Sequence, residues 1–539
     1  MPDTELNPYL NKGAEGELTI TAEGYTELDR VLTDSKGQVY AFTENASPLL
    51  VAAAMARLSR RAGDMRLTYL DEFATTGTAG AEKLIERVVT GYGDDSVQQL
   101  GGIQFVVEGA SNWLTKQLER GRLAAYLEQS TRYIYFDQKD ADGCYLYYVP
   151  KNLDKATKTE YEKTLDAVFE SYSTMVRGLT DYVRTQNPEP EDKKERTAWM
   201  NATRAKACDA VRAVLPTSTK STVGIFGSYQ AVEMLVMRLL SEPMLEAQEV
   251  GEGILAAARA VAPTFFRRAD IPERGGATTA FRATTRQAMR EIAKDLKGEV
   301  VKDAPLIQLL DYWPKKELDL LPGMLFEFSA PLLPGQVTEQ VKTWSKKQQE
   351  EAFATYMGTR LNRRHKPGRA AEKAHFEWVV TGDYGTFRDL QRHRLMDEMQ
   401  WQALTPYLGY EVPEIVTEAG LEKPFRKCFE LSEKLYKLLT DKGYVHEAQY
   451  ATLLGHRMSY RFTANLRELF HLFELRTQPD GHPGYRKICL AMYEELKKAY
   501  PLSAKAMRFV NQREDPELVR MAAELATQHK LERLEAQGK

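Results

Sequence analysis

The residues with the most informative chemistry lie in one run, RGRLAAYLEQSTRY, at residues 120–133. This run and the residues just before it combine basic, acidic and polar side chains, namely Gln117, Arg120, Arg122, Glu128, Ser130 and Arg132. Guanidinium groups bind phosphate through paired hydrogen bonds, while a carboxylate and a hydroxyl orient polar groups of a sugar or a ring. Three arginines around a Glu-x-Ser-x-Arg-Tyr sequence therefore predict a site for a phosphorylated ligand. A solvated charged surface is the alternative for the same residues.

A second set of basic and polar residues lies in the C-terminal half of the chain. It comprises Arg392, His393, Arg394, Asn465, Arg467, His471 and Arg476. The last four lie in ANLRELFHLFELR at residues 464–476, where the apolar residues have helical spacing. Arg476 ends this run as Arg238 ends an earlier one, YQAVEMLVMRLL. Stabilisation of a helix C-terminus is the alternative role for both arginines.

The elements that position these residues occur twice in the same order. In the first half, the pattern predicts a strand at 103–107, a helix from residue 111 into a polar loop, a strand pair at 134–136 and 146–149, and a helix at 229–240. In the second half, it predicts a strand at 376–380, a basic helix leading into a loop at 391–402, and a helix at 464–476. The repeated order predicts an internal duplication.

The duplication sets the expected domain limits. We expect an N-terminal extension at 1–37, a first unit at 38–270, a linker rich in charge, glycine and proline at 271–300, a second unit at 301–512, and a helical tail at 513–539. Ser47 and the proline after it predict a capped helix near the start of the first unit. A charged helical insertion at 152–200 and the tail are expected to lie on the surface.

Composition limits the classes of function. The chain has 539 residues, 43% of them hydrophobic and 28% charged, and a net charge of −3. These values predict a globular protein with no membrane span, no secretory signal and a cytoplasmic location, and they do not indicate nucleic-acid binding. The four cysteines, Cys144, Cys208, Cys428 and Cys489, are far apart, so we expect buried thiols and neither a zinc site nor disulfides.

The first motif resembles that of the flavin-dependent thymidylate synthases of the ThyX family. That family has Gly-x-Ser-Arg, a Gln-Leu pair, Arg-His-Arg and then Ser-x-Asn-Glu-x-Ser-x-Arg-Tyr. The positions that match are Gly109, Ser111, Gln117, Leu118, Arg120, Arg122, Glu128, Ser130, Arg132 and Tyr133. Downstream, VRAVLP at 211–216 resembles the family's Ala-Arg-x-x-Leu-Pro, which assigns Arg212 to the substrate, and Arg238 stands where the family has an arginine near the pyrimidine ring.

Departures from the family pattern differ between the two halves. In the first half, Gly121 replaces the histidine of Arg-His-Arg, and the flavin-side positions are taken by Asp94, Gly227, Tyr229 and Glu233. In the second half, Arg-His-Arg is complete and residues 465–476 match the family's Asn-x-Arg-x-x-x-His-x-x-x-x-Arg helix. The nucleotide loop is lost there, because an offset of 272 places Gln400, Gln402 and Leu404 at the positions of Glu128, Ser130 and Arg132, and Gln449 lies near that of Arg212.

The resemblance implies a fold and a reaction. It implies an α+β fold with two units, each an antiparallel sheet flanked by helices, which form a pseudo-dimer; two chains would form a homodimer equivalent to the family's tetramer. The first half would bind the nucleotide and the second half FAD. The reaction would transfer a one-carbon unit from methylenetetrahydrofolate to C5 of a uridine nucleotide, dUMP by default, with NADPH as reductant and Arg238 as the catalytic cation. No metal is expected. The alternatives are a flavoenzyme acting on another nucleotide or on a polynucleotide pyrimidine, and a binding protein without catalysis.

Overall fold

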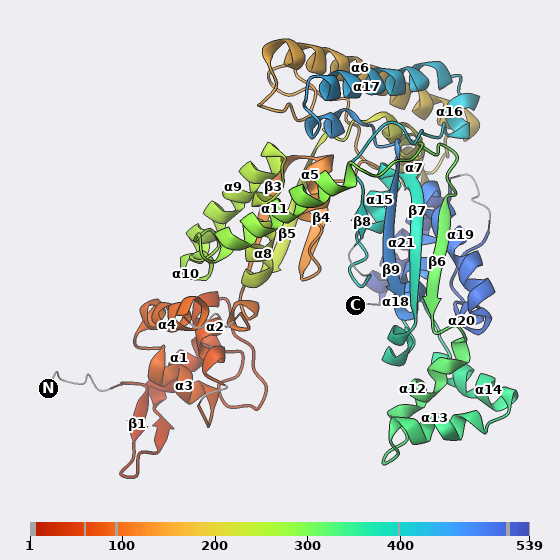
Figure 1. Ribbon diagram of the computed structural model, residues 1–539. Helices are drawn as coiled ribbons and strands as arrows, with labels where there is room; N and C mark the ends of the chain where they lie inside the picture. Colours follow the sequence, from red (N-terminus) through yellow and green to blue (C-terminus); the bar gives the residue numbers. More distant parts are fainter. Residues whose placement is uncertain (1–6, 59–60, 92–94, 397–398, 514–517, 538–539) are drawn as a thin grey trace. The chain divides into compact units, whose positions relative to one another are not determined.

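The computed structural model describes residues 7–58, 61–91, 95–396, 399–513 and 518–537, and they form two compact units (Figure 1). The first unit contains Met1–Glu108, Leu123–Glu128 and Thr222–Lys297, and the second contains Gly109–Arg122, Gln129–Ser221 and Gly298–Lys539. Each unit is therefore discontinuous in sequence. Within the described residues, no helix has the length and apolar character needed to cross a membrane.

The first unit combines a helical N-terminal part with a small sheet. The N-terminal part consists of the antiparallel pair β1 (Leu10–Lys12) and β2 (Leu18–Ile20) and helices α1 (Ala22–Val31), α2 (Pro48–Arg57), α3 (Met65–Glu72) and α4 (Gly77–Ile85). As expected, the hydroxyl of Ser47 caps α2. The sheet has the order β3 (Gly102–Ser111), β5 (Lys220–Ser228), β4 (Ala124–Glu128), and it is followed by helices α8 (Tyr229–Leu240), α9 (Leu245–Val261), α10 (Pro263–Phe266) and α11 (Gly275–Ala293). Helix α11 occupies most of the expected linker.

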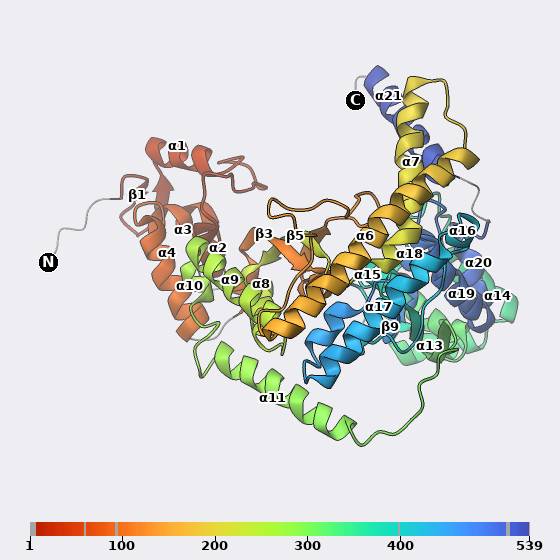
Figure 2. The ribbon, with the colours of Figure 1, turned by 90° about the horizontal axis from the view of Figure 1, so that it is seen from above.

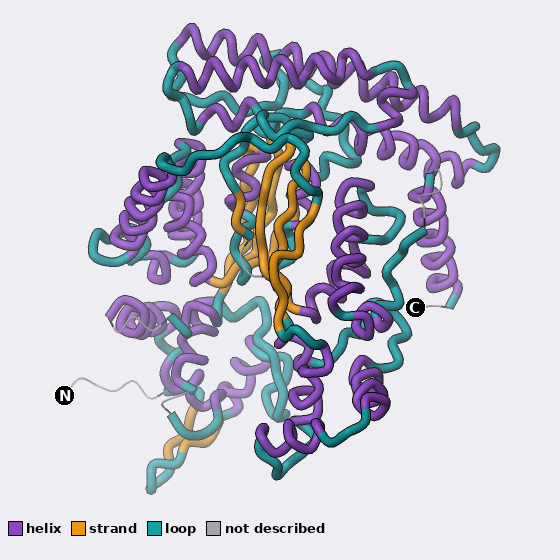
Figure 3. Tube along the Cα trace, turned by 45° about the vertical axis from the view of Figure 1, so that its right-hand side comes forward, coloured by secondary structure: helices purple, strands orange, loops and turns teal. Residues whose placement is uncertain are grey.

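The second unit is built on a four-stranded antiparallel sheet, whose strands are orange in Figure 3. Its order is β6 (Ile307–Trp313), β7 (His375–Asp383), β9 (Arg457–Asn465), β8 (Gln400–Trp401). Alternate residues of β7, Phe376, Trp378 and Val380, are buried, because successive side chains of a strand point to opposite faces. The helices are α5 (Asn112–Leu118), α6 (Lys155–Gln186), α7 (Lys193–Val211), α12 (Leu321–Phe326), α13 (Pro334–Lys342), α14 (Lys346–Met357), α15 (Tyr384–Leu390), α16 (Glu414–Glu418), α17 (Glu422–Asp441), α18 (Leu466–Arg476), α19 (Pro483–Ala499), α20 (Pro501–Ala506) and α21 (Val519–Ala536).

The element order confirms the duplication. The first copy runs β3, α5, β4, α6, α7, the 3-10 turn η3 (Arg212–Val214), β5 and α8. The second copy runs β7, α15, β8, the short helix α16, α17, the 3-10 turn η6 (Glu447–Ala451), β9 and α18. The two orders agree apart from α7 in the first copy and α16 in the second. The strand orders β3-β5-β4 and β7-β9-β8 correspond as well. The α+β fold with two related copies is therefore confirmed.

The loops after η3 and η6 pair with each other in the second unit. The N–H of Thr217 donates to the carbonyl of Thr452, and the N–H of Leu454 donates to the carbonyl of Leu215, both over 2.8 Å. An isolated antiparallel bridge joins Pro216 and Leu453. Replacing each residue by its counterpart 237 positions away in the sequence turns the first of these bonds into the second. An approximate two-fold axis therefore passes through this bridge.

The expected surface insertion at 152–200 is instead part of the core. Helix α6 lies beside α17 (Figures 1 and 2), and one face of it is buried. That face includes Tyr161, Leu165, Val168, Phe169, Tyr172, Met175, Val176 and Leu179. Like α6, α17 follows the short strand of its copy and packs in the second unit, so we assign α6 to the repeat, whereas α7 has no counterpart between α17 and η6. The expected helical tail is present as α21, which packs against α7 (Figure 2).

Several local expectations were wrong. No strand pair forms at 134–136 and 146–149, because the segment packs on α6 and the N–H of Phe136 donates to the hydroxyl of Tyr172. The helix expected from residue 111 is present as α5, capped by Ser111, but it ends at Leu118, and β4 follows where a polar loop was expected. Of the four thiols, three are buried, but Cys144 is exposed.

The strand pairing also corrects the expected alignment of the two copies. Glu128 pairs with Val223, and Trp401 pairs with Tyr460. Since Val223 and Tyr460 are 237 residues apart, as Pro216 and Leu453 are, Trp401 takes the place of Glu128. The offset of 272 is thus one residue too small after α15, and Leu404 corresponds to Thr131.

Candidate active site

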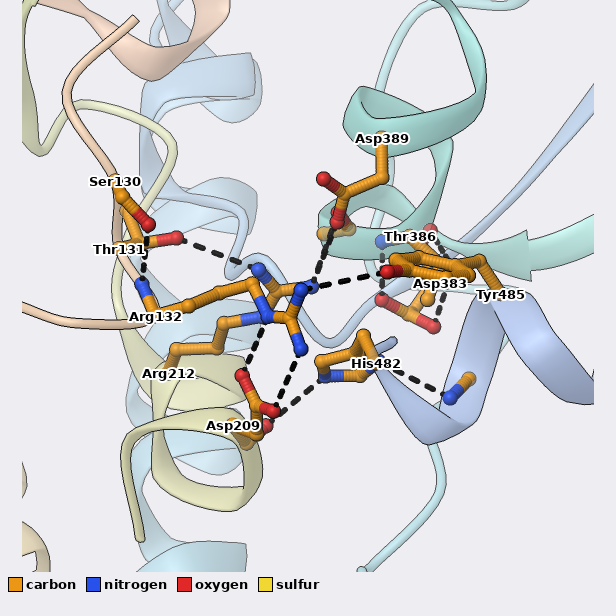
Figure 4. Close-up of polar contacts among 12 residues, drawn as sticks. Ser130, Thr131, Arg132, Asp209, Arg212, Asp383, Thr386, Asp389, His482 and Tyr485 are labelled. Atoms are coloured by element: carbon orange, nitrogen blue, oxygen red, sulfur yellow. Dashed lines mark hydrogen bonds and ion pairs between the residues drawn. The ribbon is translucent and has the colours of Figure 1, made fainter. Parts of the chain in front are cut away.

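Arg132 lies in a buried cluster of charged residues in the second unit (Figure 4). Its Nε and Nη2 donate to the two carboxylate oxygens of Asp209 over 2.8 and 3.0 Å, and its Nη1 donates to the hydroxyl of Tyr485 over 3.3 Å. Burial lowers the pKa of Arg132, but Asp209 outweighs burial and raises it above the usual range. Burial raises the pKa of Asp209, against the effect of Arg132 and Arg212. This paired geometry holds the Arg132 guanidinium in one orientation.

Arg212 lies beside Arg132 and is 4% exposed. Its Nη1 donates to Thr131 Oγ1 over 3.4 Å, and its Nη2 donates to the Gly385 carbonyl and to Asp389 Oδ2, each over 3.3 Å. Burial would raise the pKa of Asp389, but Arg212 and neighbouring arginines hold it well below its usual range. A Cβ at residue 385 would lie 3.7 Å from Arg212 Nη2, which is an ordinary contact distance, and 3.1 Å from Asp383 Oδ1, so a bulky side chain there would crowd the guanidinium.

The cluster borders a cavity of about 750 Å³ in the second unit. Its lining includes Asp209, Arg212, Asp383, Gly385 and His482. His482 Nε2 donates to the Asp209 carbonyl over 3.1 Å, and its Nδ1 accepts from the N–H of Gly484 over 3.0 Å. Burial, reinforced by Arg212 and Arg132, keeps the pKa of His482 well below its usual value. The cavity has the size of small-molecule sites in proteins.

Arg476 brings the second copy to the same cluster. Its Nη2 donates to the carbonyl of Asp389 over 2.6 Å, and its guanidinium lies 5.1 Å from the Tyr485 ring, which Arg132 also approaches at 5.8 Å. Its Nε donates to His393 Nε2 over 2.9 Å, and His393 Nδ1 lies 2.8 Å from Glu468 Oε1. His393 is buried, not on an exposed helix surface, and it lies in the turns after α15 rather than in the expected helix at 391–402.

The remaining residues of the second set surround this network. Arg392 and Arg394 are exposed, while Arg467 is half-buried and its Nε donates to the Pro367 carbonyl over 2.9 Å. Asn465 caps α18, with Oδ1 accepting from the N–H of Glu468 over 2.9 Å. Burial lowers the pKa of His471 to about 4.

His393, Glu468 and His471 place three potential metal ligands within 4.8 Å of one another. Burial lowers the pKa of His393 most, and the positive charges of Arg476 and Lys366 lower it further. The same two positive charges disfavour a metal cation at this place. Both ring nitrogens of His393 are also engaged in hydrogen bonds. The orientations of His393 and Glu468 are therefore explained by their hydrogen bonds to each other and to Arg476.

The other residues of the first set have varied environments. Ser130 Oγ accepts from the N–H of Arg132 over 3.2 Å, Arg120 lies over the Trp401 ring at 4.8 Å, Gln117 is buried and Arg122 is exposed. Glu128, on β4, and Arg238, in the last turn of α8, belong to the first unit.

The substituted flavin-side positions of the first half also lie in the first unit, except that Asp94 lies outside the described residues. The Tyr229 ring is buried and stacks on Phe265 at 4.3 Å, and Glu233 pairs with Arg268 over 2.8 Å. Ser228 caps α8 as Asn465 caps α18. Ser228 therefore takes the place of Asn465, so the expected alignment of the second copy's helix with Gly227, Tyr229 and Glu233 is wrong by one residue.

The structure thus brings together Arg132, Arg212 and Arg476, which the sequence placed in two separate sets. It adds residues that the sequence did not indicate, namely Asp209, Asp389, Tyr485 and His482. Asp209 precedes Arg212 by one helical turn, which is the only local signal for its role. No local signal exists for Tyr485, because its contact with Arg132 joins residues 353 apart.

Comparisons with known proteins cover both copies. A family model described as thymidylate synthase complementing protein, Thy1, matches residues 39–264 and 308–502. A UPF0159 protein of Chlamydia muridarum is 30% identical over 517 residues, covering 91% of this chain and 96% of that protein. A flavin-dependent thymidylate synthase of Pyrococcus furiosus is 31% identical over 103 residues, 19% of this chain and 41% of that protein. A solved structure of a UMP/dUMP methylase, PolB from Streptomyces cacaoi bound with 5-Br dUMP, is 17% identical with a TM-score of 0.31, covering 39% of this chain and 96% of that one.

Proposed function

Because the chain belongs to the thymidylate synthase complementing protein family, we propose that it transfers a one-carbon unit to C5 of a uridine nucleotide, dUMP by default. One observation carries this proposal: arginines of both copies meet around Asp389 and Tyr485, next to a cavity of about 750 Å³. A site made jointly by two copies explains why each copy lost a different part of the family's motifs.

Arg132 and Arg212 are proposed to bind the phosphate. Their orientation is fixed by Asp209 and Asp389, and Arg212 uses three of its five N–H donors in its contacts with Thr131, Gly385 and Asp389. The remaining donors are available to phosphate oxygens. From the match to the family motif, we also propose five further substrate-binding residues, Gln117, Arg120, Arg122, Glu128 and Ser130.

The catalytic cation has two candidates. The family motif assigns Arg238, and that assignment remains our proposal for the residue near the pyrimidine. Within the described cluster, Arg476 stands at the corresponding end of the second copy's helix and contacts the residues that orient Arg212. A fixed cation at this place stabilises the negative charge that develops on the ring carbonyls during attack from C5. Parallel kcat measurements on Arg238→Ala and Arg476→Ala distinguish the two.

FAD is proposed as the cofactor of the second copy. Exposed Arg392 and Arg394 flank buried His393, and Arg467 lies on α18 nearby, which fits the anionic diphosphate of a dinucleotide. When bound, reduced FAD would supply the hydride; NADPH and methylenetetrahydrofolate are the cosubstrates proposed from the family. Asn465, His471 and Arg476 complete the proposed cofactor set, which the family motif on α18 assigns. We further propose copies at 38–270 and 301–512, and a homodimer of chains.

The test is a tritium-release assay with [5-³H]dUMP, FAD, NADPH and methylenetetrahydrofolate. We expect release that depends on all three additions and falls about 100-fold in Arg132→Ala, with Thr405→Ala, the equivalent position of the second copy, as the matched control. Binding of dUMP and FAD without release would indicate a protein without catalysis. Release only from another uridine nucleotide or from a polynucleotide would replace dUMP as the substrate.

A further inference from the structure

Three buried or half-buried side chains form a linear network between α18 and the turns after α15. Glu468 Oε1 lies 2.8 Å from His393 Nδ1, and His393 Nε2 lies 2.9 Å from Arg476 Nε. Glu468 and Arg476 are on the same helix, eight residues apart, while His393 bridges them from a different segment. Glu468 belongs neither to the predicted set nor to the family motif on this helix.

The protons in this network can be assigned from chemistry. An arginine is protonated at every pH that a folded protein meets, so Arg476 Nε can only donate. His393 Nε2 must then accept, and burial next to Arg476 and Lys366 keeps the pKa of His393 well below its usual value, so the ring is neutral. Its single proton therefore resides on Nδ1 and is donated to Glu468 Oε1. Glu468 accepts the Nδ1 proton and so stabilises, together with Arg476, the tautomer whose Nε2 can accept from Arg476.

The orientation of Arg476 matters beyond this network. Its Nη2 donates to the Asp389 carbonyl, and the side chain of the same Asp389 pairs with Arg212. Its guanidinium also lies over Tyr485, the ring that Arg132 contacts. We infer that Glu468 is a positioning residue, which acts through His393 to orient Arg476 toward the nucleotide site; this inference rests on the proposed function for the identity of the ligand.

The first test measures the tautomer directly, by ¹⁵N NMR of protein labelled at histidine, with His393 assigned through His393→Asn. We expect a protonated Nδ1 and an unprotonated Nε2 in the unmodified chain and in Glu468→Gln, whose amide oxygen accepts the same hydrogen bond. Glu468→Ala should lose this pattern. A protonated Nε2 in the unmodified chain, or an unchanged pattern in Glu468→Ala, would overturn the inference.

The second test is a double-mutant cycle on the dissociation constant of dUMP, measured by calorimetry. Glu468→Ala should weaken dUMP binding about tenfold, a loss typical of one misplaced charge-assisted contact, Glu468→Gln should restore it, and Glu468→Ala should have no further effect in an Arg476→Ala background. Additive effects of the two substitutions contradict positioning through Arg476. Glu430→Ala, an exposed glutamate of α17, is the control for charge. If the unmodified chain does not bind dUMP, the proposed function fails, while the tautomer measurement still decides the role of Glu468.

Discussion

Two pockets of the second unit, related by the approximate two-fold axis, have opposite character. In the arginine pocket, Arg212 bonds Thr131, the Gly385 carbonyl and Asp389. In the glutamine pocket, Gln449 takes the place of Arg212, and its Oε1 accepts from the N–H of Leu404 over 3.1 Å and from the Trp113 indole over 3.3 Å. The first pocket contains buried ion pairs, whereas the second contains neutral hydrogen bonds that the Trp113 indole and the backbone N–H of Leu404 donate to Gln449.

The comparison shows how one copy of a duplicated site can lose the residues that bind a ligand. Trp113 and Gly385 occupy equivalent backbone positions, since their N–H groups donate to the carbonyls of Thr217 and Leu454, which are 237 residues apart. The indole fills space in one pocket, whereas glycine leaves room for a guanidinium in the other. Buried charges cost desolvation energy and do not by themselves add stability. Their retention in one pocket only is therefore better explained by ligand binding than by stability.

The largest expected effect is that of Arg212→Ala. Removing this guanidinium leaves Asp389 buried without its partner, and breaking a buried ion pair in this way costs about 3–5 kcal/mol. We expect this loss in the free energy of unfolding, measured by urea denaturation, together with loss of detectable dUMP binding by calorimetry.

Its matched control is Gln449→Ala in the glutamine pocket. The substitution leaves two donors without their acceptor and should cost about 1–3 kcal/mol of unfolding free energy. Binding of dUMP should be unchanged. Equal losses of dUMP binding in the two variants would show that both pockets bind nucleotide, and the contrast between them would fail.

The next effect concerns pH and Glu468. Burial raises the pKa of Glu468 from 4.5 to about 7. A carboxyl with a raised folded-state pKa contributes stability that is fully present below pH 4.5 and is lost as the pH rises through 7. Glu468→Gln cannot ionise, so it should be more stable than the unmodified chain by about 3 kcal/mol at pH 8 and by nothing at pH 4. Thermal unfolding across this range checks the sign, and a gain that is independent of pH would exclude ionisation of Glu468 as its cause.

The sequence predicted the repeated elements but not the pairing of charges between copies. Helical and strand periodicity located α5, α8, α18, β3 and β7, since each has a regular apolar pattern. The role of Asp389 was not visible, because its partner Arg212 lies 177 residues away. Arg-His-Arg was expected on a helix, whereas the bonds of His393 to Glu468 and Arg476 are made from turns. Contacts that depend on how the two copies meet leave no local periodic signal.

Arg132→Ala should also destabilise the fold, because it leaves Asp209 without its ion pair, but its expected effect on ligand binding is smaller than that of Arg212→Ala. Loss of one charge-assisted contact to phosphate should weaken dUMP binding by about 1.5–3 kcal/mol. Leu404→Ala should leave the dissociation constant unchanged, and so should Thr405→Ala, the counterpart of Arg132 once the alignment is corrected by one residue. Calorimetric titrations of all three variants provide the comparison. If Thr405→Ala weakens dUMP binding as much as Arg132→Ala, the nucleotide is not confined to the arginine pocket.

The smallest expected effect is on FAD binding. Here the comparison is between the whole first copy and the whole second copy, and no longer between the two pockets. The histidine of Arg-His-Arg and Arg467 occur only in the second copy, where Arg467 donates to the Pro367 carbonyl from a half-buried position. The first copy has Gly121 between Arg120 and Arg122, and Gln230 takes the place of Arg467. One FAD per chain is therefore expected, measured from flavin absorbance against protein concentration. Arg467→Ala should weaken FAD binding about tenfold, or about 1.4 kcal/mol, and Arg461→Ala, an exposed arginine of β9 paired with Glu377, is the control. Two FAD per chain would mean that the first copy has kept a cofactor site without these residues, and the division between the copies would then be limited to the nucleotide.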